Sequence, residues 1–116
     1  MDRFIYKIAT AEQWQAAQRD GLFAGAPVDL ADGFIHFSTA SQIRETAARH
    51  FRYQQGLVLL EIDIEKMAQK PIWEPSRGGL LFPHLYGTLQ LGDITQVWQL
   101  PVDDSGEHRF PETIGA

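Results

Sequence analysis

The chain contains no cysteine, and that absence removes several classes of site at once. Disulfide frameworks, thiolate zinc sites and cysteine nucleophiles all require this residue. The sequence also has no apolar run of about 20 residues, the length that a membrane-spanning helix needs, and its first residues lack the apolar stretch of a signal peptide. We therefore expect a cytoplasmic protein with no membrane partner.

Positive charge is scarce as well. Ten Lys and Arg residues stand against fifteen Asp and Glu residues, which gives a formal net charge of −5. Because nucleic-acid binding draws on the neutralisation of phosphates, we expect no nucleic-acid partner. The sequence also lacks a Gly-x-Gly-x-x-Gly run, a Walker sequence and a Gly-x-Ser-x-Gly elbow. A nucleotide must then be held in another way, and a Ser-His-Asp hydrolase is disfavoured.

What is present is a globular composition, with 44% hydrophobic and 22% charged residues in 116 residues, a length that suits one domain over residues 1–116. A continuous apolar run at residues 57–62 predicts a central strand that is covered on both faces. Alternating patterns predict further strands at residues 4–9 and 94–100. Together they predict an α+β fold with a mixed, mainly antiparallel sheet.

Two Thr-x-x-Gln signatures, at Thr10 and Thr39, are typical of helix N-termini. They predict the two main helices of the fold, the second over residues 40–53. Residues 22–32 have no sustained period, and we expect a loop there, either a plain connection or a loop that closes over a ligand at the edge of a pocket. After Pro101 we expect a loosely ordered tail, residues 102–116.

Two unusual runs concentrate polar and aromatic groups. They are Gly33-Phe34-Ile35-His36-Phe37-Ser38-Thr39 and Phe82-Pro83-His84-Leu85-Tyr86-Gly87. Strand alternation puts His36 and Ser38 on one face of the first run, together with Phe34, while the residues between them point to the core. We expect the two runs to form two walls of one pocket.

We predict that His36, Glu74 and His84 are the catalytic residues of this pocket. Histidine exchanges protons near neutral pH, and a carboxylate can act as a base or stabilise a developing positive charge. The alternative for His36 is a histidine satisfied inside a packed core. The same three residues match a metal triad by type. Their spacing differs from that of known metal motifs, so we expect no metal.

We predict that the ligand is held by Ser38, Trp73, Tyr86 and Arg77. Ser38 would act with His36 on a ribose or an amide, and the two aromatic side chains offer flat faces for stacking on a ring. Arg77 would bring positive charge to a pocket in an acidic chain. The other reading of Arg77 is a solvated surface charge.

With these residues in view, the chain resembles the small bacterial family called domain of unknown function 952. The resemblance runs from Ile5 to Leu100, through the two runs above and Trp14, Gln42, Leu59-Leu60-Glu61-Ile62-Asp63 and Trp73-Glu74. By this resemblance the fold is similar to that of the ADP-ribosyltransferases, whose split, mainly antiparallel sheets clamp NAD. The order of elements around His36 also looks like the catalytic half of the NAD-dependent RNA 2′-phosphotransferases.

In transferases of that fold a His-x-Ser/Thr pair on a strand holds NAD, a tyrosine stacks on the nicotinamide, and often a late glutamate orients the ribose. The resemblance implies the first role for His36 and Ser38, whereas Tyr86 and Glu74 correspond by residue type alone. The nucleic-acid-binding segment of the phosphotransferases is absent here. RNA is therefore not expected as a substrate.

The resulting hypothesis is a pocket for NAD or a related ADP-ribose compound, with NAD as a substrate for glycosidic cleavage or ADP-ribosyl transfer. A second hypothesis is a non-catalytic module that binds a small metabolite or a peptide in the same pocket. A third is a metal-dependent hydrolase. In each case the expected partner is a small molecule or a protein terminus, and the sequence does not predict an oligomeric state.

Overall fold

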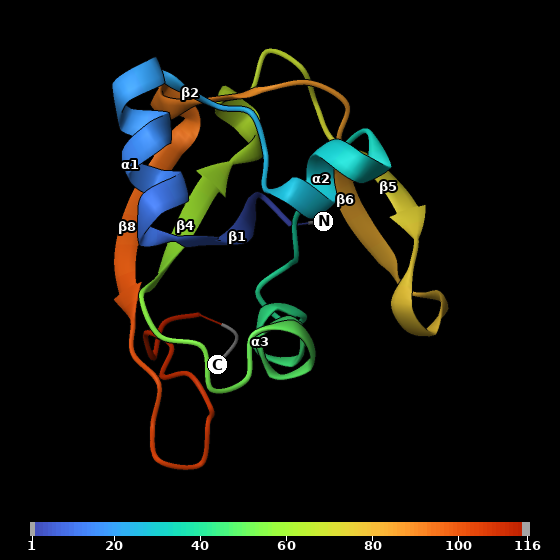
Figure 1. Cartoon of the computed structure of the whole chain (residues 1–116). Helices are drawn as coiled ribbons and strands as arrows, with labels where there is room; N and C mark the ends of the chain where they lie inside the picture. Colours follow the sequence, from blue (N-terminus) through green and yellow to red (C-terminus); the bar gives the residue numbers. More distant parts are fainter. Residues whose placement is uncertain (1, 115–116) are drawn as a thin grey trace.

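The structure is a computed structural model that describes residues 2–114, with Arg77 described in its backbone only. It has an α+β fold (Figure 1). The strands are β1 (Phe4–Thr10), β2 (Leu22–Phe23), β3 (Ile35–His36), β4 (Leu57–Asp63), β5 (Ile72–Pro75), β6 (Leu81–Leu85), β7 (Leu89–Gln90) and β8 (Ile94–Leu100). The helices are α1 (Ala11–Asp20), α2 (Pro27–Asp32) and α3 (Ile43–His50), with short 3₁₀ turns η1 (Ile64–Lys66), η2 (Arg77–Gly79) and η3 (Leu91–Asp93).

The first sheet has the order β1-β4-β8, and both of its pairings are antiparallel. Its middle strand, β4, is the apolar run of the sequence, and it is buried on both faces as predicted. One face packs on α1 through Ala17, and the other packs on α3 through Ile43 and Ala47. A strand between two layers needs apolar residues on both sides, which explains why β4 does not alternate until Glu61.

The second sheet has the order β3-β6-β5, again with antiparallel pairings. It lies on the right of Figure 1, away from the sheet that α1 covers. An isolated antiparallel bridge connects the two sheets, in which the backbone N–H groups of Tyr6 and Ser38 each donate to the other residue's carbonyl, at 2.8 and 3.0 Å. The expected mainly antiparallel pairing is thus confirmed, and it is divided into two three-stranded sheets and a two-stranded sheet of β2 and β7.

The predicted loop at residues 22–32 is wrong in part, because it contains β2 and α2. Proline occupies the first position of α2, where its missing N–H costs nothing. The side chain of Asp29 accepts a hydrogen bond from the backbone N–H of Ala26 at 2.7 Å and so closes the start of the helix. A helix of six residues is too short to show a hydrophobic period, which is why the pattern did not reveal it.

The first capping signature is confirmed, since Thr10 and Gln13 form a reciprocal capping box before α1. The second helix is shorter than predicted. Residues 40–42 form turns before α3, and only the Gln42 side chain reaches back, where it accepts from the N–H of Thr39 at 3.0 Å. At the other end, Tyr53 has a positive φ of 65°, which is incompatible with a continuing helix.

The described part of the tail, residues 102–114, contacts the rest of the fold at several points, while its loose order stays a prediction. Ile114 is buried in the cluster beneath α3, and its carbonyl accepts a hydrogen bond from the Arg44 guanidinium. Gly106 has a φ of 85° and lies against the ring of Tyr53. Polar turn residues gave the tail the composition of a disordered segment, but one apolar residue near its end anchors it.

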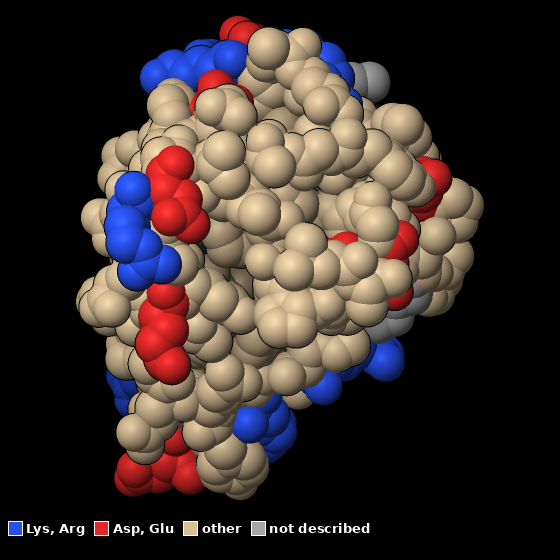
Figure 2. Space-filling view, turned by 45° about the horizontal axis from the view of Figure 1, so that its top comes forward, with Lys and Arg blue, Asp and Glu red and all other residues tan. Residues whose placement is uncertain are grey.

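Within residues 2–114, none of the helices has the length and apolarity needed to cross a membrane. The face of the molecule in Figure 2 carries its charged side chains mostly around the edge, and the middle of that face is largely uncharged.

Candidate functional site

A cavity of about 540 Å³ lies where the two sheets diverge. Its walls come from β1, β3 and β6, from α3 and from the end of α2. The residues that line it are Tyr6, Lys7, Ile8, Val28, Asp32, His36, Phe37, Ser38, Ile43, Thr46, His50, Phe51, Ser76, Phe82 and His84. Both predicted runs therefore contribute to one cavity, as the sequence suggested.

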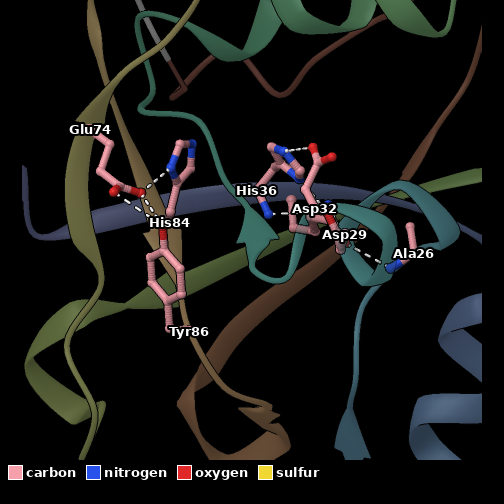
Figure 3. A network of polar contacts seen from close by, with 8 residues as sticks. Ala26, Asp29, Asp32, His36, Glu74, His84 and Tyr86 are labelled. Atoms are coloured by element: carbon pink, nitrogen blue, oxygen red, sulfur yellow. Dashed lines mark hydrogen bonds and ion pairs between the residues drawn. The ribbon is translucent and has the colours of Figure 1, made fainter.

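His36 lies on β3 between two carboxylates of α2. Its Nδ1 is 2.6 Å from Oδ1 of Asp29, which also accepts the backbone N–H of His36 at 3.1 Å. Its Nε2 forms an ion-pair contact of 2.9 Å with Oδ2 of Asp32 (Figure 3). The ring is one-third exposed and faces the cavity. Position and orientation of this imidazole are thus set by the helix that precedes it in the chain.

Asp29 is the buried centre of this arrangement. Its side chain is 1% exposed, and Lys7 of β1 contacts both of its oxygens, at 2.9 and 3.1 Å. Burial would raise the pKa of Asp29, but hydrogen bonds from His36, Lys7 and Ala26 outweigh that effect and lower the pKa to about 2. Burial lowers the pKa of Lys7, and Asp29 opposes that shift. The carboxylate therefore stays ionised and accepts hydrogen bonds from both Lys7 and His36.

His84 is the second histidine of the cavity, and it has a carboxylate partner of its own. Its Nδ1 is 2.7 Å from Oε1 of Glu74 on the neighbouring strand β5, and the Tyr86 hydroxyl donates to both oxygens of Glu74 at 2.8 and 3.1 Å (Figure 3). Hydrogen bonds from His84 and Tyr86 lower the pKa of Glu74, and the bond to Glu74 raises the pKa of Tyr86. An ionised Glu74 fixes the proton of His84 on Nδ1 and leaves Nε2 basic.

The two histidines share one aromatic cluster. They are opposite residues in the antiparallel pairing of β3 with β6, and their ring centroids are 5.4 Å apart. The ring of Phe34 stacks on His84 at 4.1 Å and lies 4.6 Å from His36 and 5.2 Å from Tyr86. Phe34 thus shields one side of both imidazoles, and their remaining surfaces are directed towards the cavity.

Ser38 and Trp73 have neighbours that the sequence did not predict. Ser38 lines the cavity, but its hydroxyl is buried and lies 2.8 Å from that of Thr46. Trp73 packs on the core cluster, on the face of β5 opposite to Glu74. Trp73, Glu74 and Tyr86 are not among the described residues that line the cavity, and the stacking roles expected of Trp73 and Tyr86 stay predictions. The side chain of Arg77 lies outside the described residues.

The arrangement gives no support to a metal centre built from His36, Glu74 and His84. Glu74 contacts Nδ1 of His84, while the Nδ1 of His36 faces Asp29, so the three groups do not converge. Among the side chains that the structure describes, no group of three His, Asp or Glu residues is placed to hold a metal ion.

Sequence reasoning missed Lys7, Asp29 and Asp32. Lys7 was placed on the first strand, yet a lysine within an otherwise buried strand already signals a buried partner. Asp29 and Asp32 fall in the segment predicted as a loop, and their roles depend on the short helix α2. Two further lining residues, Thr46 and His50, come from α3, which lies within the helix predicted at residues 40–53.

Comparison with known proteins places the chain next to proteins without a described activity. It matches the family described as "Protein of unknown function (DUF952)" over residues 8–97. It is similar to protein CC0527 from Caulobacter crescentus, whose crystal structure has a TM-score of 0.87 and 46% identity over 91% of this chain and 93% of that chain. A crystal structure of a double mutant of CC0527 gives the same values, and the solution NMR structure has a TM-score of 0.81 and covers 91% of each chain. No curated protein matches.

Proposed function

Because the chain belongs to the DUF952 family of proteins of unknown function, we propose its function from the chemistry of its own site. We propose that the cavity between the two sheets binds NAD or a related ADP-ribose compound. The bound compound then undergoes glycosidic cleavage or ADP-ribosyl transfer. An ADP-ribosyltransferase-like arrangement of the sheets is part of this proposal, and the division of the sheet at the bridge between Tyr6 and Ser38 supports it.

The observation that carries the proposal is the pair of histidines on one cavity wall, each oriented from behind by its own carboxylate. Asp29 holds His36 and Glu74 holds His84. Carboxylates that fix the tautomer and direction of an imidazole are a feature of acid–base sites. A histidine in a packed core needs hydrogen-bond partners for its ring nitrogens. That need does not explain why His36 and His84 both line the same cavity of about 540 Å³. That volume lies within the range of sites for small ligands, about 300–1,000 Å³.

In the proposed step, the bond between the anomeric carbon of the ribose and the nicotinamide nitrogen breaks, and its electron pair leaves with nicotinamide. The oxygen of water or of an acceptor hydroxyl forms the new bond to that carbon. Its proton passes to Nε2 of His84, the ring nitrogen that Glu74 leaves basic. Atoms and charge balance, because the cationic nicotinamide leaves neutral and His84 gains the proton.

Aromatic side chains other than Trp73 supply the flat surfaces for a bound ring. Tyr6, Phe51 and Phe82 line the cavity and come from three different elements. Tyr6 is fixed because its hydroxyl donates to Glu61 at 2.8 Å; burial, followed by this hydrogen bond, raises the pKa of Tyr6. A stacked base or nicotinamide would lie on these walls, while the histidines contact polar groups of the ribose.

The test is a thermal-shift titration of the full chain with NAD, ADP-ribose and nicotinamide, together with an assay for released nicotinamide. Ligand that binds only the native state raises the melting temperature by mass action. We expect a shift with NAD and slow nicotinamide release, and we expect both to be lost in His36→Ala and the release to be lost in His84→Gln. The matched control is His108→Gln, since His108 contacts the carbonyl of Gln54 and does not line the cavity. No shift with any of the three compounds at millimolar concentration would remove the proposal.

A binding module without catalysis is the second candidate, and one observation favours it. Glu74 is the carboxylate that the sequence assigned to charge stabilisation, yet both of its oxygens are engaged by His84 and Tyr86. If it keeps these contacts when ligand binds, it cannot face an oxocarbenium-like ribose. Saturable binding of NAD or ADP-ribose without release of nicotinamide would support the module over the enzyme.

A further inference from the structure

Asp32 projects a carboxylate into the cavity, directly onto the nitrogen of His36 that a ligand would use. It lines the cavity, and its Oδ2 is 2.9 Å from Nε2 of His36 (Figure 3). We propose that Asp32 stands in for an anionic group of the ligand. When the ligand binds, a phosphate oxygen displaces the Asp32 carboxylate and accepts the hydrogen bond from Nε2–H of His36. This inference rests on the proposed function, because it assigns the diphosphate of an ADP-ribose compound to that same site.

The first argument is the protonation that this geometry demands of His36. Carboxylate oxygens only accept hydrogen bonds, and both ring nitrogens of His36 lie within 2.9 Å of one. A neutral imidazole would turn a lone pair against one of the two carboxylates. The arrangement with both contacts therefore belongs to the imidazolium, which offers a charged N–H donor to the cavity.

The second argument is the charge balance around His36. Lys7 and Asp29 are 8% and 1% exposed, so their charges are poorly screened by water. Lys7 and the His36 imidazolium are balanced by Asp29 and Asp32. Once Asp32 moves away, two cations face a single buried anion, and a net positive charge faces the cavity. His84, across from His36, does not supply a balancing negative charge. An anion is the group that restores neutrality there.

The third argument is that Asp32 is the carboxylate that can leave. Asp29 is buried and takes hydrogen bonds from Lys7, from Ala26 and from the ring and backbone of His36. Asp32 is 48% exposed, and within the described chain its carboxylate has only the contact with His36. It is the last residue of α2, and Gly33 after it has a φ of 86°. The side chain can swing into solvent without breaking a hydrogen bond of the helix.

The experiment compares the wild type, Asp32→Asn and Asp20→Asn in calorimetric titrations with ADP-ribose and with inorganic pyrophosphate at pH 6. Asp20 is a matched control, because it is also the last residue of a helix and precedes a left-handed glycine, Gly21, yet it pairs with Arg19 outside the cavity. We expect Asp32→Asn to bind both probes about two- to fivefold more tightly than the wild type, the range that loss of one competing, half-exposed ion pair allows. Asp20→Asn should bind like the wild type, which removes net charge as the explanation.

The variant His36→Gln completes the test. It keeps a polar side chain beside Asp29 but has no cationic donor, so we expect pyrophosphate affinity to fall at least tenfold. Its melting temperature, measured in parallel, shows whether it folds. If it does not, the long-range ¹H–¹⁵N spectrum of the wild type replaces it: both His36 nitrogens should have protonated shifts, and pyrophosphate should move the Nε2 signal more than the Nδ1 signal.

Failure of the inference and failure of the proposed function give different results. If ADP-ribose binds and Asp32→Asn binds it equally or more weakly, Asp32 is a ligand contact or a bystander, and the stand-in role is overturned while the function stands. If pyrophosphate binds Asp32→Asn more tightly than the wild type but no ADP-ribose binding is seen in either protein, the anion site stands and the proposed function fails. Absence of pyrophosphate binding by every variant overturns the anion site.

Discussion

His36 and His84 are opposite one another in the pairing of β3 with β6, and the Nδ1 atom of each faces a carboxylate from a different element. Asp29 comes from the helix before β3, and Glu74 comes from the strand beside β6. The imidazoles are therefore held from outside their own strands. The two carboxylates are therefore positioning groups. Substitution of a carboxylate misplaces a histidine, whereas substitution of the histidine removes it, so the two effects can be measured separately.

The first prediction concerns the buried pair of Lys7 and Asp29. Asp29→Asn leaves the Lys7 ammonium buried without its counterion, and we expect the free energy of unfolding to fall by about 3 kcal/mol. Urea denaturation of the full chain measures this. Asp32→Asn is the control, because the half-exposed Asp32 should contribute about 1 kcal/mol or less. Equal stability of the two variants would contradict the central role of Asp29.

The second prediction is the acid dependence of stability. The folded pKa of Asp29 is about 2, below its unfolded value, so its contribution is complete above the unfolded pKa and is lost as the pH falls through the folded pKa. We expect the wild type to lose about 2 kcal/mol of unfolding free energy from this group as the pH falls from about 4 to 2. Denaturation curves of the wild type and Asp29→Asn, measured over this range, should therefore converge in acid. Parallel curves would show that Asp29 is not the group responsible.

The third prediction uses Tyr86 to report on Glu74. The hydrogen bond to Glu74 raises the pKa of Tyr86, so Glu74→Gln should lower that pKa towards the ordinary value of about 10. The ultraviolet absorbance of tyrosinate, titrated in Glu74→Gln and in the wild type, measures the change. The same titration of Tyr86→Phe assigns the transition. If the assigned transition stays where it is in Glu74→Gln, the two side chains are not coupled in solution.

The fourth prediction separates orientation from proton transfer. Because Glu74 fixes the tautomer of His84, Glu74→Gln should slow release of nicotinamide by about tenfold or more, with little effect on the affinity for NAD. Tyr86→Phe keeps the contact between Glu74 and His84 and should change the rate only slightly. A large loss of NAD affinity in Glu74→Gln would assign Glu74 to binding instead.

The fifth prediction concerns the packed tail. A Cβ at Gly106 would lie 2.7 Å from the ring of Tyr53, and the φ of 85° disfavours any side chain there. We expect Gly106→Ala to lower the free energy of unfolding by about 2 kcal/mol, from backbone strain and the displaced ring. Gly92→Ala is the matched control, since open space surrounds Gly92 and its φ is not in the left-handed region. Equal melting temperatures for the two variants would mean that the tail does not hold Tyr53.

The three strands of the first sheet and the two longer helices could be predicted because their signals are local. A continuous apolar run identifies β4, and a Thr-x-x-Gln box identifies the start of α1. The cavity wall that carries His36 and His84 could also be predicted, because both residues lie in runs too polar for an ordinary strand end. Helix α2 was hidden because six residues do not complete two turns, and its carboxylates were lost with it.

The placement of Trp73 depends on a different signal. Adjacent residues of a strand point to opposite faces, so Trp73 and Glu74 of β5 cannot both face one pocket. Alternation, applied to this pair as it was applied to His36 and Ser38, assigns one of them to the core. Only the register of β5 with β6 tells which, since it puts Glu74 beside Phe82 and Trp73 beside Pro83.

The bridge between Tyr6 and Ser38 has a mechanical meaning. Within residues 2–114 it is the one backbone pairing between the two three-stranded sheets, a joint of two hydrogen bonds at the edge of the cavity. A second connection is made by side chains, because Ile5 and Leu60 of the first sheet belong to the same buried cluster as Ile35 and Leu85 of the second. Any change in the angle between the sheets would have to repack this cluster, so the width of the cavity is tied to the core as well as to the residues that line it.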